Sequence, residues 1–228
     1  MKSIPIKIEK RGFGAVTLSA KTHEIVILGW FGKGEHEVDP ADFGIIDVIG
    51  TTQVQSFGNT TEISLQIEKQ AEKRDRKLWY LFQLINLPLK SFSGDVTVRW
   101  RKFDGDDVKV VVDGVIKKNS FSLFHRNWVW SATPLRRVRR EMKEFRENLP
   151  QGNHTVGFWA DEQPILHTVR FDVSGFKRTP SKYDPEWTGK FEDDSDDILL
   201  ARLIFGEAEN QLREAKTAVG WSVFNRLK

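Results

Sequence analysis

A single carboxylate near the C-terminus occupies a position from which it could act as an acid. Residues 201–228 read ARLIFGEAENQLREAKTAVGWSVFNRLK. On a helix of about 100° per residue, Glu207 falls between Leu200 and Leu203, inside the apolar sector. Burial without a partner favours the protonated carboxyl, which is the form that a general acid for glycosidic cleavage requires. The other interpretation is a core glutamate that pairs with an arginine, for instance Arg226.

Three tryptophans, Trp128, Trp130 and Trp159, are candidates for carbohydrate binding. Trp128 and Trp130 stand two residues apart in NWVW, so on a strand they would share one face. A pair of exposed indoles forms a platform on which the apolar faces of sugar rings pack. The other interpretation is that these tryptophans belong to the core of a β-sandwich.

Other site chemistries find little support in the residue types. The chain has no cysteine, which excludes disulfides, thiolate metal sites and a thiol nucleophile. The five histidines, at positions 23, 36, 125, 154 and 167, show no metal-ligand spacing within one helix. The sequence contains no phosphate-binding glycine loop and no nucleophile elbow. We therefore expect neither a metal nor a cofactor.

The charge pattern is that of a globular protein with a mixed surface. The 228 residues carry a formal net charge of +3, and acidic and basic side chains interleave along most of the chain. The basic run RRVRR is followed by glutamates, so we expect a solvated face and no nucleic-acid partner. No window reaches the roughly 18 apolar residues that span a bilayer. The N-terminal MKSIPIKIEKRGFG lacks the apolar region of a signal peptide.

The elements that must position the candidate residues are mostly strands. Up to about residue 175, segments rich in Val, Ile, Phe and Trp are separated by turn sequences such as FDGD and PQGN. Examples of these segments are HEIVILGWF, VTVRWRKF, VKVVVDG and LHTVRFDV. The pattern predicts a mainly β fold, built as an antiparallel sandwich or a barrel.

One segment inside this β region has a helical pattern. Leu135, Val138, Met142, Phe145 and Leu149 follow one another at steps of three and four residues, which places them on one helical face. A threonine and a proline directly before them suit a helix cap and a first helical position. We predict a helix over residues 134–149.

The composition divides the chain into four parts. Residues 1–52 form an N-terminal β segment, 53–175 the sandwich, 176–197 a linker and 198–228 a helical piece. The acidic run at 193–197 lies where a helix N-terminus favours negative charge. This interpretation is preferred over a calcium site, because the run lacks the glycine-spaced loop of such sites.

The helical piece also carries a family resemblance. LLARLIFGEAENQLREAKTAVGWSVFNRL resembles the opening of the SleB-type cell wall hydrolase domain, the spore cortex-lytic family. The matching residues are Ala201, Arg202, Phe205, Gly206, Glu207, Ala208, Ala218, Val219, Asn225 and Arg226. The resemblance implies a lysozyme-like lytic transglycosylase with Glu207 as its catalytic acid and the sugar's own hydroxyl as the attacking group.

This sequence departs from the family pattern at Glu209, Asn210 and Ala215, on the substrate side of the motif. The resemblance covers about 30 residues, and a complete domain of the family would continue past Lys228. The chain therefore looks like a fragment, or a product truncated inside its catalytic domain.

A looser resemblance covers about residues 95–173. VKVVVDG, NWVW and LPQGNHTVGFWADEQPILHTVRFDV look like the C-terminal half of a jelly-roll carbohydrate-binding module. This resemblance implies a jelly-roll-like sandwich in which Trp128, Trp130 and Trp159 contact carbohydrate. It would also begin a strand within residues 144–149, in conflict with the helix predicted there.

Together these patterns predict a peptidoglycan-directed cell wall hydrolase with a carbohydrate-binding β-domain. Its partner would be peptidoglycan or another polysaccharide, and it would act in the cell envelope or outside the cell. The alternative is a non-catalytic β-sandwich that binds carbohydrate or protein, which without an export signal would be cytoplasmic.

Overall fold

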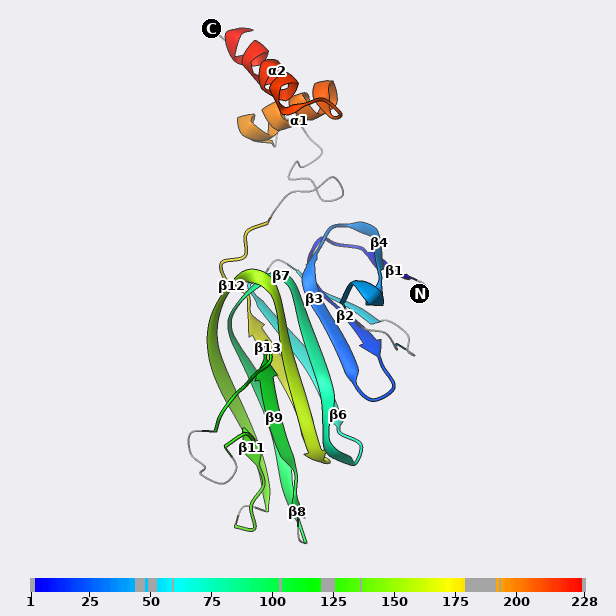
Figure 1. The fold of residues 1–228 in the computed structure, drawn as a ribbon, viewed down its shortest axis with the longest axis vertical. Helices are drawn as coiled ribbons and strands as arrows, with labels where there is room; N and C mark the ends of the chain where they lie inside the picture. The colour runs from blue at the N-terminus through cyan, green and yellow to red at the C-terminus, as the bar shows by residue number, and fades with distance from the viewer. Residues whose placement is uncertain are drawn as a thin grey trace. The chain divides into compact units, whose positions relative to one another are not determined.

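The computed structural model describes residues 3–43, 48, 53–58, 60–102, 104–119, 126–135, 137–178, 192 and 194–226. The chain divides into two compact units, Met1–Arg178 and Thr179–Lys228. The first unit contains all the strands, and the second contains two helices (Figure 1). The predicted mainly β fold is confirmed.

The strands of the first unit are β1 (Ile4–Ile8), β2 (Gly12–Ser19), β3 (Glu24–Phe31), β4 (Gly34–Val38), β5 (Gln53–Gly58), β6 (Glu62–Gln70), β7 (Arg74–Arg101), β8 (Asp104–Gly105), β9 (Asp107–Val112), β10 (Val115–Ile116), β11 (Trp130–Ser131), β12 (Val138–Glu162) and β13 (Ile165–Asp172). A 3-10 turn, η1 (Pro40–Phe43), follows β4. Two of these strands, β7 and β12, are far longer than the others and organise the unit.

The long strands β7 and β12 pair antiparallel and belong to two layers at once. One section of the sheet, which we call layer A, contains these strands in order: β10, β9, the second half of β12, the first half of β7, β3, β2 and β5. Layer B contains the first half of β12, the second half of β7, β13 and β6. The two layers are therefore parts of one sheet that folds over on itself. Figure 1 shows β12 passing over one end of the sheet between its two halves.

The fold-over is built from irregularities in both long strands. The β7–β12 register shifts between Arg146 and Leu149 and again before His154. Asn148 on β12 and Asn86 on β7 both have φ of 53°, in the left-handed region that asparagine tolerates. Unpaired residues of this kind bend a strand and increase its twist, which turns the sheet from layer A to layer B.

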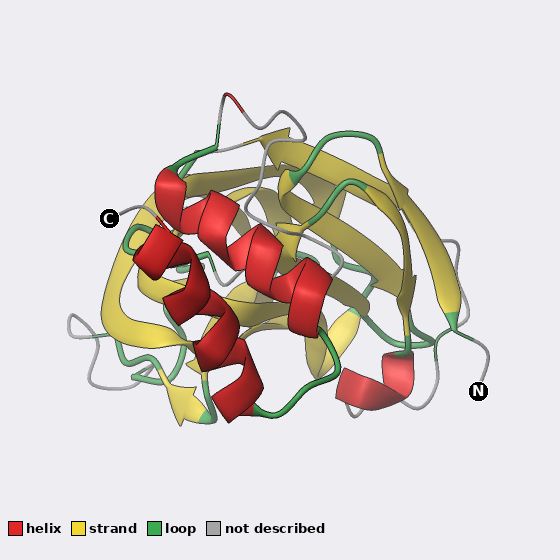
Figure 2. Cartoon of the chain, turned by 90° about the horizontal axis from the view of Figure 1, so that it is seen from above, coloured by secondary structure: helices red, strands yellow, loops and turns green. Residues whose placement is uncertain are grey.

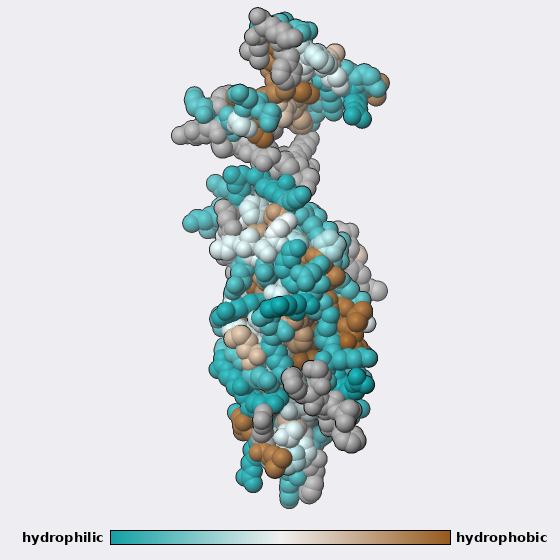
Figure 3. All heavy atoms as spheres, turned by 90° about the vertical axis from the view of Figure 1, so that its left-hand side faces the viewer, coloured by the Kyte–Doolittle hydropathy of each residue, from teal (hydrophilic) through white to brown (hydrophobic). Residues whose placement is uncertain are grey.

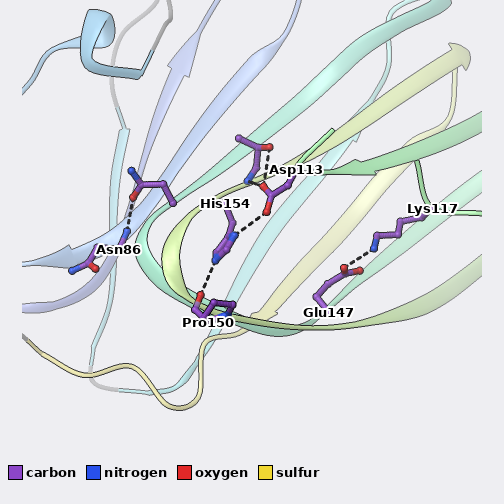
Figure 4. Close-up of polar contacts among 8 residues, drawn as sticks. Asn86, Asp113, Lys117, Glu147, Pro150 and His154 are labelled. Carbon is purple, nitrogen blue, oxygen red and sulfur yellow. Dashed lines mark hydrogen bonds and ion pairs between the residues drawn. The ribbon is translucent and has the colours of Figure 1, made fainter. Parts of the chain in front are cut away.

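Polar side chains fix this corner (Figure 4). The amide of Asn86 donates to Oδ1 of Asn153 at 2.9 Å. His154 Nε2 donates to the Pro150 carbonyl at 2.7 Å, and its Nδ1 lies 2.9 Å from Oδ2 of Asp113. Asp113 occupies the tight turn between β9 and β10, so His154 ties that turn to the bend.

The main core fills the space between the two layers. Phe82 of layer A lies 5.3 Å, centroid to centroid, from Phe171 of layer B, and Phe92 of layer B lies 6.4 Å from Phe158 of layer A. Strands β1 and β4 form a separate two-stranded sheet, and their Ile6, Ile8 and Val38 join a second core with side chains of β2 and β3. This arrangement is sandwich-like; the jelly-roll connectivity stays a prediction.

The helix predicted over residues 134–149 is wrong, because β12 begins at Val138. Exposure alternates along this strand, so Phe145 and Leu149 face the core while Val138 and Met142 are 61% and 56% exposed. The spacing that suggested a helical face thus holds residues from both sides of a strand. Pairing with β7 along residues 89–99 supplies the hydrogen bonds that decide the conformation.

Some of the side chains of β12 on the same face as Phe145 are charged, and they find partners near this edge of the sheet. Lys143 donates to the Val129 carbonyl at 2.8 Å, and Lys117 pairs with Glu147. Burial lowers the pKa of the Lys143 ammonium, and Glu141 partly offsets this. Inward-pointing charges are a common device against edge-to-edge association of strands.

The boundaries of the first unit differ from those predicted by composition. Strands β2 and β3, from the predicted 1–52 segment, lie in the same sheet as β7, so this segment is not separate from the sandwich. At the other end, Phe176 stacks on Trp30 at 5.6 Å, and Gln151 exchanges two hydrogen bonds with the Lys177 backbone. The unit therefore reaches Arg178, and most of the predicted linker lies outside the described residues.

The second unit contains α1 (Asp196–Ala208) and α2 (Arg213–Arg226). Figure 2 shows the two helices side by side, joined by a short turn. Asp196 and Asp197 lie in the first turn of α1, where the helix dipole favours acidic side chains, as predicted. Of the described helices, neither is long and apolar enough to cross a membrane.

Candidate functional site

The structure brings two of the candidate tryptophans together around a lysine. The ammonium of Lys109 lies 4.4 Å from the ring centroid of Trp159 and 5.7 Å from that of Trp128. All three side chains are half-buried. Such distances are typical of cation–π contacts. We call Trp128, Lys109 and Trp159 the indole–lysine site.

Strand alternation places this site on the outer face of layer A. Val108, Val110 and Val112 of β9 are buried in the main core, so Lys109 between them points to the opposite face. Trp159 of β12 lies directly across from Lys109 in the β9–β12 ladder. The two side chains therefore meet because of register, although 50 residues separate them in the sequence (159 − 109).

Trp128 reaches the same place from the segment that precedes β11. The amide of Val129 donates to the Val108 carbonyl at 2.8 Å, which holds this segment beside β9. The Trp128 carbonyl accepts from the side-chain amide of Asn119 at 3.2 Å. These contacts hold the peptide group between Trp128 and Val129, which places the second ring next to Lys109.

Polar groups border the indole–lysine site. Asp161 follows Trp159 by two residues on the same face of β12 and pairs with Arg76 at 3.2 Å. Asp161 also lies directly across from Asp107, two residues before Lys109 on β9. Two aromatic faces with carboxylate, guanidinium and ammonium groups around them match the needs of a sugar, whose C–H faces pack on rings while its hydroxyls form hydrogen bonds.

Trp130 does not belong to this site, so its predicted place on a platform with Trp128 is wrong. Its side chain is fully buried, and its ring stacks on Phe158 at 6.2 Å. Its Nε1–H donates to the Glu141 carbonyl at 2.9 Å. A Cβ added to Gly94 would lie 3.1 Å from this indole, a tight contact that the glycine avoids.

The reason for this difference is where the strand begins. A two-residue spacing puts side chains on one face only when both residues lie on a strand. β11 begins at Trp130, and Trp128 lies before it in irregular backbone. Sequence reasoning missed Lys109, for which the available signal was a lysine among alternating valines in VKVVVDG.

Glu207, the candidate acid, lies in the last turn of α1 and is exposed. The expectation that it is buried in an apolar sector is therefore wrong in this structure. Among the described residues Glu207 forms no ion pair with Arg226, which is also exposed, so the core-pairing interpretation is not supported either. The next residue, Ala208, is the buried one.

The physical reason is that two helices offer little surface to bury an apolar sector. Leu203 and Phe205 of α1 are 43% and 41% exposed, and Trp221 of α2 is 59% exposed. The helices meet closely near Gly220, where an added Cβ would lie 3.4 Å from Cδ1 of Ile204. Gly206, beside the candidate acid, faces open space.

Comparison with protein-family models, with curated proteins and with solved structures finds no match to this chain. Among the described residues no group of three or more histidine, aspartate or glutamate side chains is arranged to hold a metal ion.

Proposed function

We propose that this protein is a peptidoglycan-directed cell wall hydrolase whose β-unit binds the glycan. The observation that carries the glycan-binding part is the indole–lysine site, in which two half-buried indoles flank one ammonium on a sheet face. The hydrolase part rests on the resemblance of residues 198–228 to the SleB-type family.

Three features support binding at the indole–lysine site. A half-buried indole on the outer face of a sheet still exposes apolar surface to water. A bound ligand would cover that surface, which favours binding. Asp161 and Arg76 beside it provide both hydrogen-bond acceptors and donors. The ammonium of Lys109 can donate to a ring hydroxyl or to an N-acetyl carbonyl, and both groups are common in cell-wall glycans.

Glu207 would act as the general acid that protonates the glycosidic oxygen. Its exposure leaves the carboxyl open to a polysaccharide, and Leu203 lies four residues earlier on the same side of α1. A sugar ring bound over Leu203 would bring a glycosidic oxygen within reach of this carboxyl. A hydroxyl of the substrate would attack the anomeric carbon as the protonated glycosidic bond breaks, and its proton would pass to the Glu207 carboxylate.

A pull-down on insoluble peptidoglycan tests the binding part. Trp128→Ala and Trp159→Ala should each reduce the bound fraction, since each removes one stacking surface worth about 1 kcal/mol or more. Trp221→Ala is the matched control, because it removes an exposed indole from the other unit. Unchanged binding in both variants would remove the indole–lysine site from the proposal.

Turnover of purified peptidoglycan tests the hydrolase part separately. Glu207→Gln keeps the shape of the side chain and removes its proton-transfer role, so it should abolish any release of muropeptides while leaving the pull-down unchanged. A second candidate function, glycan binding without cleavage, needs only the indole–lysine site and gives Glu207 no role. If the unaltered chain binds peptidoglycan and Glu207→Gln leaves the rate of muropeptide release unchanged, binding without cleavage is the function supported.

A further inference from the structure

We propose that the outer face of layer B carries a second ligand site, a trough that takes a neutral polyhydroxylated chain. It follows β7 between its neighbours β12 and β13 and contains none of the residues of the indole–lysine site. This inference goes beyond the proposed function, because either site can exist without the other.

Small side chains on the central strand form the floor of the trough. Phe92 and Val96 of β7 are buried in the core, so Ser91 and Ser93 point to the outer face. The neighbouring strands carry longer side chains at the same levels. The result is a hollow of about 450 Å³ lined on its two sides by Glu144 and Arg170, a size within the range of small-ligand sites.

The strand register arranges charges across the trough in pairs. Ser93 has Glu144 on one side and Arg170 on the other. One level further, Ser91 has Arg146 on the first side and Asp172 on the second. Each level thus places one acid against one base across a serine, and Glu62 of β6 adds a further carboxylate to the lining. A charged chain would meet one like charge at every level beside the opposite one, whereas the mixed donors and acceptors suit a neutral hydroxylated chain.

Much of the hydrogen-bonding capacity of these side chains is unused, although Oδ1 of Asp172 accepts from the Ser174 amide at 2.8 Å. Arg146 lies 3.9 Å from Glu144, and Arg170 lies 4.0 Å from Glu62, distances that are too long for hydrogen bonds. Within the described part of the chain, the hydroxyls of Ser91 and Ser93 and the carboxylate of Glu144 form no side-chain hydrogen bond. A ligand hydroxyl can both donate and accept a hydrogen bond. A hollow that offers donors and acceptors together can therefore bind a row of hydroxyls.

Met142 adds an apolar contact to this polar hollow. Its side chain is 56% exposed and lines the same trough. A flexible thioether adapts to the uneven C–H face of a sugar ring. Among the residues that Figure 3 colours, the face turned to the viewer is mostly hydrophilic, with separate hydrophobic patches.

Backbone chemical shifts of the full chain, titrated with neutral hexasaccharides of N-acetylglucosamine, glucose and xylose, test this site. We expect at least one hexasaccharide to shift the amides at positions 91–95, 142–146 and 168–172 with a Kd of about 1 mM or tighter. Ser93→Tyr fills the trough from its floor and should weaken that binding about tenfold or more. Lys7→Tyr adds the same ring at an exposed strand position elsewhere and should leave it unchanged.

A second variant keeps the test independent of steric disturbance. Arg170→Met removes the donor at the Ser93 level without filling the hollow, and we expect it to weaken the same hexasaccharide severalfold. Trp159→Ala should leave the shifts at these amides intact, which separates this trough from the indole–lysine site. No saturable shift with any of the three sugars, shifts confined to residues around Trp159, or full binding by Ser93→Tyr would each overturn the proposal.

Discussion

The β-unit and the helical unit differ in how much of their apolar surface their own elements cover. In the β-unit, valines, leucines and aromatic residues from both layers are almost fully buried. In the helical unit, Ala208 is the one buried hydrophobic residue among those described. Trp130 and Trp221 show the contrast directly, since the first is fully buried and the second is 59% exposed.

The two units therefore draw on packing to different extents for their stability. Burial of apolar surface is the main favourable term in folding, and the β-unit has two layers to bury between. Isolated helices of fewer than about 12–15 residues are marginal in water, and most helical stability in proteins comes from packing. Two helices that leave Leu203, Phe205 and Trp221 exposed have little of it. We therefore expect the β-unit to be the cooperative part of the molecule.

The largest expected effect comes from the pair of tryptophans. Trp130→Ala should lower the free energy of unfolding by about 3–5 kcal/mol, since it leaves a cavity beside Gly94 and removes the hydrogen bond to the Glu141 carbonyl. Trp221→Ala should change it by less than about 0.5 kcal/mol. Urea denaturation followed by circular dichroism measures both. Equal losses in the two variants would contradict the contrast between the units.

The next effect concerns Asp106, a fully buried carboxylate that joins three segments of the β-unit. Its Oδ2 accepts from the Arg99 amide at 2.8 Å, and its Oδ1 accepts from the Gln163 amide at 3.0 Å. Asp106→Ala should cost about 2–3 kcal/mol, because it leaves two part-buried backbone donors without their acceptor and removes the ion pair with Arg101. The nearby exposed Asp104, changed to alanine, serves as the control in the same denaturation experiment, and a loss as large there would refute the role of Asp106.

A smaller effect should appear as a change in pH dependence at Asp113. Burial opposes ionisation of this carboxyl, but hydrogen bonds from Thr155 and the neighbouring His154 outweigh it and hold the pKa below its ordinary value. Because the pKa of Asp113 is lower in the folded than in the unfolded chain, its ionised carboxylate adds to the free energy of unfolding above about pH 4. This contribution is lost as the pH falls through the folded-state pKa. Asp113→Asn should therefore lower stability at neutral pH and flatten its decline in acid. Thermal midpoints measured between about pH 3 and pH 7 check this, and parallel curves for both proteins would contradict it.

The smallest effect should follow from removing the helical unit altogether. A chain of residues 1–178 should unfold at the same temperature as the full chain, because Phe176 and Lys177 complete the contacts of the β-unit. A peptide of residues 192–228 should show little helix by circular dichroism. A marked loss of stability in the shortened chain would show that the helices stabilise the β-unit and would contradict the expected independence of the two units.

Local patterns in the sequence determined the strand content and the helical piece. Val108, Val110 and Val112 alternate at period two, and this pattern depends only on neighbouring residues that share a face. The acidic residues before α1 and the apolar repeat within it likewise mark a helix without reference to the rest of the fold. The sequence also identified Trp128 and Trp159 as candidates, although it paired Trp128 with the wrong partner.

Only the tertiary structure decided which faces are buried and which distant residues meet. Phe145 and Leu149 fit a helical face as well as a strand, and the ladder with β7 selected the strand. Trp159 meets Lys109 through the β9–β12 register, which no local pattern encodes. Glu207 lies in an apolar sector of α1, yet it is exposed because burial requires a covering neighbour and not only a pattern. Periodicity therefore specified the elements of this protein, while pairing and packing specified its surfaces.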